Sequence, residues 1–139
     1  MPQLNPYLSF DGNCADAMHF YARVLGAKLD KLITYGEAPS NPPAPPEHAN
    51  RIMHASLVHP DFALMAGDAP PGMPFEGMQG VMLALTYPSV SEAQRVFAAL
   101  ADGGTVQMPL CETFWVESFG MVTDRFGTAW GINGGKAKM

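Results

Sequence analysis

Residues 114–133 read FWVESFGMVTDRFGTAWGIN, and this stretch decides the fold of the 139-residue chain. Two short, aromatic-rich apolar runs flank the sequence DRFG at 124–127, whose glycine suits the left-handed last position of a four-residue turn. Large side chains alternate with small or polar ones along both runs, as in strands that pack one face on a core or present it to a small molecule. The stretch therefore predicts a β-hairpin.

Changes in hydrophobic period predict the elements that precede this hairpin. A helical period follows Asn13, which is predicted to cap a helix that ends at Gly26. Ser89 and Glu92 form a capping box for a second helix, which ends at residues 102–104. Apolar, strand-like runs predict further strands at 5–10, 27–35, 51–58, 62–66, 81–86 and 105–110.

Three segments are predicted to lie outside the regular elements. Residues 37–50 contain five prolines and are expected to form an exposed loop. Residues 72–80 are rich in glycine and methionine and are expected to connect the two halves of the chain. Residues 134–139, GGKAKM, are expected to be frayed. Asp68 and Asp124 are predicted to be turn residues.

The two halves of the chain repeat one order of elements, a strand, a helix and three strands. Superposing Ala17 on Ala93 aligns Asn13 with Ser89 without a gap inside the helix. A unit of this size is too small to bury both faces alone, so it is expected to pair with its copy. The prediction is an α+β fold in one domain, residues 1–139. It consists of two paired βαβββ modules, about 5–68 and about 80–133, which form a cupped sheet with helices outside.

Composition excludes several classes of function. A net charge of −5 with eight scattered Lys and Arg residues leaves no basic stripe, so no nucleic-acid partner is expected. No apolar run approaches the roughly 18 residues that span a bilayer, and no secretory leader is apparent, so a cytoplasmic protein without a membrane partner is expected. Cys14 and Cys111 belong to no CxxC pair, which predicts two reduced thiols.

Several stretches together carry a family resemblance. They are YLSFDGN followed by ADAMHFYARVLGA, then IMHASLVHPDFALMAGDAPP, then TFWVESFGMVTDRFGTAWGIN. The chain resembles the PhnB-like branch of the vicinal oxygen chelate superfamily, which includes glyoxalase I, bleomycin-resistance proteins and extradiol dioxygenases. The resemblance covers nearly the whole chain. It implies paired βαβββ modules, in agreement with the repeat, and a homodimer.

The resemblance also says where a metal would bind. Enzymes of this superfamily place His and Glu ligands on the first, fourth, fifth and last strands of the fold. The corresponding positions here are 5–7, Met65 or Ala66, Val81 and Gly131, and none carries a carboxylate or an imidazole. The chain is therefore expected to lack the standard metal site, and no metal-ligating or catalytic residue is predicted. No GxGxxG turn follows a predicted strand, so no cofactor is predicted either.

Six residues are predicted to contact a small organic ligand: Tyr7, His54, Trp115, Glu117, Phe119 and Trp130. His54 lies in the middle of a predicted strand, where it is either a general base or ligand-orienting donor, or a histidine hydrogen-bonded at the sheet or dimer surface. The four aromatic residues either line a pocket or fill the core. Glu117 could act as an acid or base only if it is partly buried.

These observations predict a small-molecule-binding protein of the glyoxalase/bleomycin-resistance type. Two alternatives remain open at the level of sequence. One is a metal-dependent lyase or dioxygenase of the same fold that uses nonstandard ligands such as His54 and Glu117. The other is a dimeric structural module without a ligand.

Overall fold

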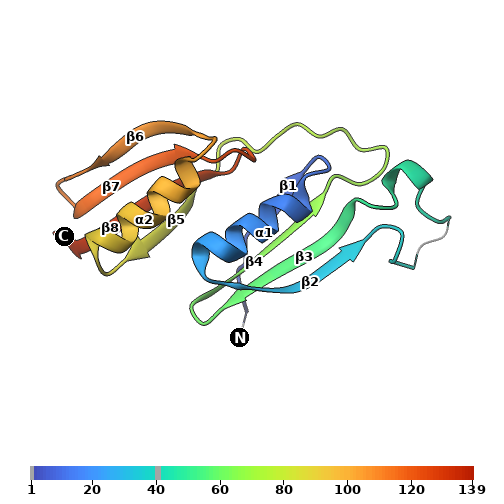
Figure 1. Ribbon diagram of the computed structural model, residues 1–139, viewed down its shortest axis with the longest axis horizontal. Helices are drawn as coiled ribbons and strands as arrows, with labels where there is room; N and C mark the ends of the chain where they lie inside the picture. The colour runs from blue at the N-terminus through green and yellow to red at the C-terminus, as the bar shows by residue number, and fades with distance from the viewer. Residues whose placement is uncertain (1, 40–41) are drawn as a thin grey trace. The chain divides into compact units, whose positions relative to one another are not determined.

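The chain folds into two successive repeats of one pattern of elements. The computed structural model describes residues 2–39 and 42–139. It divides into two compact units between Gly77 and Met78. Figure 1 labels the elements of both units. The first contains β1 (Tyr7–Phe10), α1 (Cys14–Leu25), β2 (Lys28–Thr34), the short 3₁₀ helix η1 (Pro46–His48), β3 (Ile52–His59) and β4 (Phe62–Asp68). The second contains β5 (Leu83–Tyr87), α2 (Val90–Ala101), β6 (Thr105–Cys111), β7 (Val116–Thr123) and β8 (Ala129–Ala137).

Each unit has its own four-stranded sheet, and the two sheets share one topology. The strand orders are β1-β4-β3-β2 and β5-β8-β7-β6. In each sheet the first strand runs parallel to the last, and the other neighbours are antiparallel. The predicted α+β fold of two βαβββ modules is confirmed. That the two units form a single domain stays a prediction.

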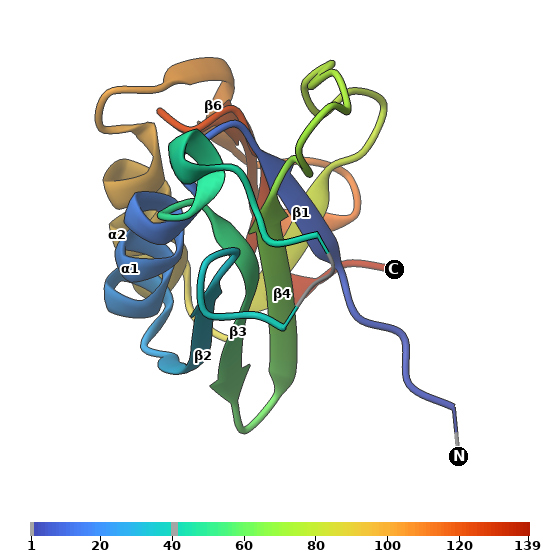
Figure 2. The ribbon, with the colours of Figure 1, turned by 90° about the vertical axis from the view of Figure 1, so that its right-hand side faces the viewer.

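One helix covers one face of each sheet, as the ribbons of α1 and α2 show (Figures 1 and 2). The apolar stripe of each helix is buried, and burying one such large side chain contributes about 1.5–3 kcal/mol. Gly26 ends α1 in the left-handed conformation, as predicted, with a φ of 67°. The buried helical residues are Cys14, Ala17, Met18, Phe20, Tyr21, Val24, Leu25, Ala93, Val96, Phe97 and Leu100.

The two helices begin at equivalent places but are capped differently. In α2 the serine half of the predicted capping box is confirmed, because Ser89 Oγ accepts from the Glu92 amide at 3.1 Å. The Glu92 side chain reaches back to the Ser89 hydroxyl, which donates to Glu92 Oε1 at 3.2 Å. In α1 the prediction of an Asn13 cap is wrong, since this side chain makes no capping hydrogen bond. Asp68 Oδ1 instead accepts from the amides of Gly12 at 2.7 Å and Cys14 at 3.1 Å.

Asp68 is therefore not the turn residue that the sequence predicted. It is the last residue of β4, is only 4% exposed, and lies opposite Phe10 of β1. Its second oxygen, Oδ2, accepts from the Ile52 amide at 2.8 Å. The residue at the matching place in the second unit is Gly134, which lies opposite Tyr87 of β5.

The end of the chain is more regular than predicted. β8 continues to Ala137, which pairs with Val116, and the Lys138 amide donates to the Trp115 carbonyl at 2.8 Å. The prediction of frayed residues from 134 onward is therefore wrong. The glycine-rich sequence hides the strand because it has no apolar alternation, and a left-handed Gly135 (φ 85°) lies beside a shift in the β7–β8 register.

The predicted proline-rich loop, 37–50, contains η1 near its C-terminal end. Residues 40 and 41 of that loop lie outside the part of the chain that the structure describes. No helix among the described residues is long and apolar enough to cross a membrane.

Candidate functional site

The candidate residues are best followed on the face of each sheet opposite its helix, here called the helix-free face. In the first unit Leu8, Ala55 and Ala66 are buried, and successive strand residues point to opposite faces. Their neighbours therefore lie on the helix-free face of the first sheet. These neighbours are Tyr7, Ser9, His54, Ser56, Met65 and Gly67.

Tyr7 and His54 form a pair on this face. The Tyr7 hydroxyl lies 3.4 Å from His54 Nδ1 and 3.3 Å from the carbonyl oxygen of Met53. The two rings are stacked, with centroids 5.8 Å apart and planes 30° apart. Two of the six predicted site residues, from β1 and β3, are thus brought together.

Gly67 of β4 makes this pair possible, because Tyr7 reaches over β4 to β3. A Cβ at Gly67 would lie 2.9 Å from Tyr7 Oη and 2.8 Å from the Met53 carbonyl oxygen. Sequence reasoning missed Gly67 as a site residue. A glycine inside a strand often marks a close approach by another group, and that signal could have identified it.

The phenol of Tyr7 stays protonated at neutral pH. Partial burial raises the pKa of Tyr7, and the nearby Cys14 thiol raises it further. Burial, followed by the nearby Tyr7, likewise raises the pKa of Tyr35, whose hydroxyl donates to the Asp68 carbonyl oxygen at 2.9 Å. The site in the first unit therefore offers neutral hydrogen-bonding groups, since both phenols keep their protons.

Aromatic residues gather at one end of β7 in the second unit. The Trp115 and Phe119 rings meet edge to face with centroids 5.3 Å apart, and Phe114 meets Trp115 in the same way at 5.0 Å. Phe114 is 76% exposed, whereas Trp115 and Phe119 are half-buried. Phe119 lies on the helix-free face, because a Cβ at the next residue, Gly120, would meet Phe97 of α2 and successive strand residues point to opposite faces.

The register shows that Phe119 and His54 hold equivalent positions in the two sheets. Ser56 pairs with Met65 on β4, as Met121 pairs with Gly131 on β8. His54 lies two positions before Ser56 on β3, and Phe119 lies two positions before Met121 on β7. The repeat thus presents a polar pair in one unit and an aromatic cluster in the other.

Trp130 lies in the core. It is 2% exposed, and its Nε1 donates to Asp124 Oδ2 at 2.8 Å. Asp124 Oδ1 also accepts from the amides of Phe126 and Thr128, so Asp124 is the predicted turn residue and anchors the indole as well. Of the two roles considered for Trp130, lining a pocket or filling the core, the structure shows core packing.

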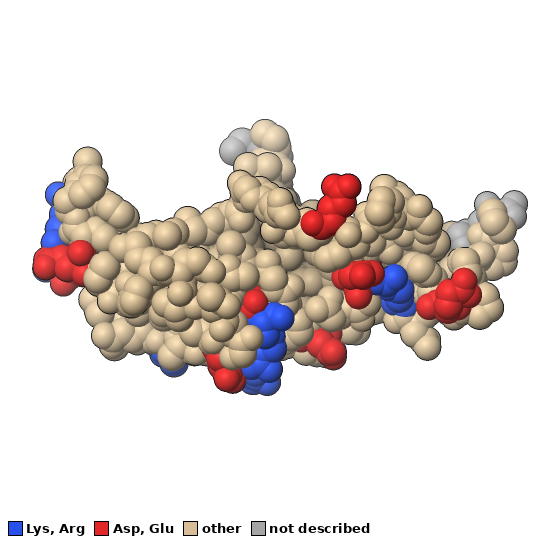
Figure 3. Space-filling model, turned by 90° about the horizontal axis from the view of Figure 1, so that it is seen from above, with Lys and Arg blue, Asp and Glu red and all other residues tan. Residues whose placement is uncertain are grey.

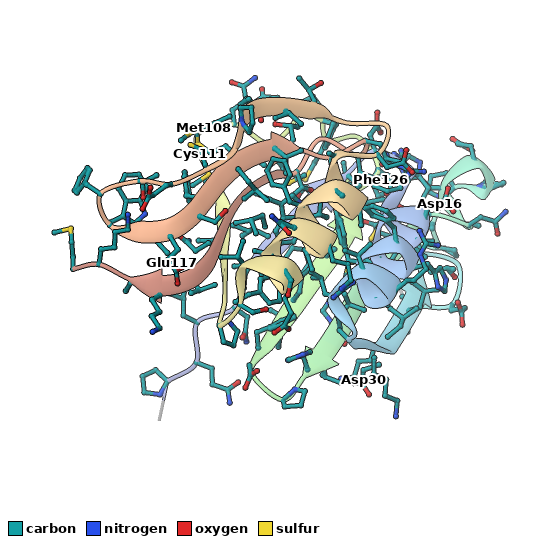
Figure 4. The ribbon with its side chains drawn as sticks, turned by 60° about the vertical axis from the view of Figure 1, so that its left-hand side comes forward. Asp16, Asp30, Met108, Cys111, Glu117 and Phe126 are labelled. Atoms are coloured by element: carbon teal, nitrogen blue, oxygen red, sulfur yellow. The ribbon has the colours of Figure 1, made fainter. Side chains whose placement is uncertain are left out.

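Glu117 is exposed, and its Oε1 accepts from the Lys136 amide at 2.6 Å. Figure 4 labels Glu117 of β7, and Met108 and Cys111 of β6. The carboxylate is therefore engaged by the backbone of β8 at the register shift. Partial burial, the condition set for an acid or base role, is not met at this residue.

The positions expected to hold metal ligands carry other chemistry. Tyr7, Met65 and Gly131 occupy helix-free faces, and Val81 precedes β5 with 69% of its surface exposed. Within residues 2–39 and 42–139 no group of three or more His, Cys, Asp or Glu side chains is arranged to hold a metal ion. On the face drawn in Figure 3, the few Lys and Arg side chains lie apart and beside carboxylates.

Known proteins resemble the chain along most of its length. The model of the Glyoxalase/Bleomycin resistance protein/Dioxygenase superfamily matches residues 3–132. Protein YjdN of Escherichia coli (strain K12) is 39% identical over 138 residues, which are 94% of this chain and 93% of that protein.

Two solved structures extend the comparison. Protein PA1353 from Pseudomonas aeruginosa has a TM-score of 0.90 and 47% identity, with 97% of this chain and 98% of that chain covered. A putative 3-demethylubiquinone-9 3-methyltransferase, PhnB protein, from Bacillus cereus has the same fold, with a TM-score of 0.78, 23% identity, and 95% and 98% coverage.

Proposed function

The chain belongs to the glyoxalase/bleomycin resistance protein/dioxygenase superfamily, as its sequence resemblance predicted, and from that membership we propose that the helix-free face of each sheet, taken by itself, is a surface that can bind a small organic molecule. The Tyr7–His54 pair carries the proposal. A phenol and an imidazole held together over Gly67 are polar groups of fixed orientation, and such groups give a binding site its specificity.

The aromatic cluster of Phe114, Trp115 and Phe119 supports the same proposal. Aromatic rings that remain partly or largely exposed offer large, rigid apolar surface for a ligand. Tyr7, Met65 and Gly131 stand where superfamily enzymes place metal ligands, so the proposed binding uses hydrogen bonds and stacking without the standard metal site. We also propose that the protein acts in the cytoplasm and that it is a homodimer. Light scattering after gel filtration tests whether it is a dimer.

A thermal-shift panel of aromatic, phenolic and dicarbonyl compounds, with divalent metals in parallel, tests the binding. At least one organic compound is expected to raise Tm, because a ligand that binds the folded state stabilises it. The shift is expected to shrink in His54→Ala and in Trp115→Ala. It should persist in His19→Ala, a matched control at an exposed position of α1.

The other outcomes decide between the remaining hypotheses. No Tm shift with any compound would overturn the binding proposal in favour of a structural module. Stoichiometric metal in protein purified without chelator would overturn the metal-free part, and its loss in His54→Ala would favour an enzyme with nonstandard ligands.

A further inference from the structure

A row of methionine side chains crosses the helix-free face of the second sheet. Met121 of β7 pairs with Met108 of β6 on one side and with Gly131 of β8 on the other. Met121 follows Phe119 by two positions, so it shares the helix-free face with that residue. Residues paired across antiparallel strands point to the same face, with Cβ atoms about 4.5–5.5 Å apart. Met108 therefore lies beside Met121 on this face.

A third methionine, Met82, fills the place that Gly131 leaves open. A Cβ at Gly131 would lie 3.0 Å from Met82 Sδ, 2.7 Å from Met82 Cε and 3.3 Å from Phe119 Cε1. That point is next to Met121 in the row, since Met121 pairs with Gly131. Met82 is 43% exposed, so its sulfur is accessible from solvent. The thioethers of Met82 and Met108 thus lie on opposite sides of Met121.

Cys111 adds a thiol to the same row. It is a free, exposed cysteine of β6 and pairs with Phe119. This pairing makes Cys111 a diagonal neighbour of Met121, at a separation that long side chains still span. Met82, Met108, Met121 and Cys111 are here called the sulfur cluster.

The nearby carboxylates are engaged elsewhere. Glu117 lies four residues from Met121 along β7, about 13 Å at the rise of a strand, and it accepts from the Lys136 amide. Glu112 forms an ion pair with Lys138. All four histidines belong to the first unit. The sulfur cluster therefore offers thioethers and one thiolate, a donor set that selects a soft ion such as Cu(I).

We propose that the sulfur cluster binds one Cu(I) ion. Met121 is the central donor, because the other three sulfur-bearing residues surround it. The Cys111 thiol gives its proton to water when its sulfur binds the ion, so one proton is released for each Cu(I) bound. This inference goes beyond the proposed binding of a small organic molecule and does not depend on it. The site is also distinct from the standard divalent-metal site, because its donors are sulfur atoms.

Titration of the reduced protein with Cu(I) under argon, in competition with a colorimetric Cu(I) chelator, measures the affinity. One Cu(I) per chain is expected, with release of one proton, and Zn(II) should not displace it, since zinc favours thiolate, imidazole and carboxylate ligands. Met121→Leu removes the central sulfur but keeps a similar volume, and it should weaken Cu(I) binding at least about tenfold. Met73→Leu is the control, at a methionine outside the cluster that is 62% exposed, and should leave the affinity unchanged.

Carbon-13 NMR of the methionine methyl groups locates the ion. Ag(I) is a diamagnetic probe with the same preference for sulfur. It is expected to shift the methyl signals of Met82, Met108 and Met121, whereas the Met73 signal should stay in place. The Met→Leu variants identify each signal.

The outcomes distinguish a cluster from a single reactive thiol. Binding that is lost in Cys111→Ser but undiminished in Met121→Leu assigns the ion to the thiol alone and overturns the proposal. Absence of methyl shifts, or equal losses in Met73→Leu and Met121→Leu, also overturns it. Urea unfolding shows whether Met121→Leu is folded, and Met108→Leu on the edge strand β6 provides a second test of the same prediction. Failure of every organic compound to bind overturns the proposed function and leaves the copper result standing.

Discussion

The carboxylate of Asp68 caps a helix that begins 54 residues before it, because Oδ1 lies 3.1 Å from the amide nitrogen of Cys14. The same oxygen accepts from Gly12, and the other accepts from Ile52. One buried side chain thus satisfies three backbone amides from two distant segments. A buried amide without a partner costs about 1–3 kcal/mol.

Replacing Asp68 with alanine should destabilise the protein by about 2–4 kcal/mol, since three amides lose their acceptor. Asp68→Asn should lose roughly half as much, because one accepting oxygen remains. Urea unfolding measures both losses. Asn13→Ala is the control and should change the free energy of unfolding by less than about 0.5 kcal/mol. An equal loss at Asn13 would contradict the assignment of the cap to Asp68.

Two glycines on the helix-free faces should differ in their tolerance of alanine. Gly67→Ala places a methyl against the Met53 backbone and the Tyr7 hydroxyl, and it should cost about 1–3 kcal/mol and displace the phenol. Gly131→Ala meets chiefly the flexible end of Met82, so a loss below about 1 kcal/mol is expected. Thermal unfolding of the two variants provides the comparison, and a larger loss at Gly131 would refute it.

The two thiols should differ in reactivity. Cys14 is fully buried, and burial, followed by the nearby Asp68, raises its pKa to about 12, whereas Cys111 is exposed. Iodoacetamide at mildly alkaline pH is expected to modify Cys111 alone in the folded protein and both residues in urea. Mass spectrometry of the digested protein locates the label. Rapid labelling of Cys14 in the folded state would contradict this prediction.

The Cys14 thiol should also make stability depend on pH. Its pKa rises from 9.0 to about 12 on folding, so the unfolded chain releases the proton first. The stabilising contribution is complete below pH 9.0 and is lost as pH rises toward about 12. Urea unfolding at pH 8 and at about pH 10 is expected to show a larger decrease in the wild type than in Cys14→Ala. The tyrosines with raised pKa values are present in both proteins, so the difference between wild type and Cys14→Ala reports the contribution of Cys14.

Asp124 should be as important to the second unit as Asp68 is to the first. Its loss removes the carboxylate that accepts from the buried Trp130 N–H and from the Thr128 amide, so Asp124→Ala should cost about 2–4 kcal/mol. Tryptophan fluorescence during urea unfolding reports the change. The matched control is Asp102→Ala, whose exposed ion pair with Arg125 should contribute less than about 1 kcal/mol.

The fold was predictable because local and repeated signals agree in this sequence. The helix beginning after Asn13 and the one beginning after Ser89 align without a gap, and both are found with 12 residues. The capping box at Ser89 is local in sequence and could be read directly. The cap supplied by Asp68 was missed because its partners lie far away in the chain, where no periodic pattern records them.

The site was predictable only in part, for the same reason. Tyr7 and His54 could be named as candidates, but their meeting depends on the strand order β1-β4-β3 and on the missing side chain of Gly67. Trp130 was named for its size, and its burial depends on the acceptor at Asp124. Glu117 was named for its charge, but its carboxylate accepts a hydrogen bond from the Lys136 amide of β8.

The remote cap at Asp68 also bears on the order in which the chain folds. α2 carries its own cap in Ser89 and Glu92, so its first turn can form before any strand has docked. α1 receives its cap only after β4 has taken its place beside β1, a contact that must first close a long loop. Folding of the first unit should therefore be completed late, with a low φ-value at Asp68 and a higher one at Ser89. During synthesis, the helix nearest the N-terminus would then wait for residue 68 to leave the ribosome.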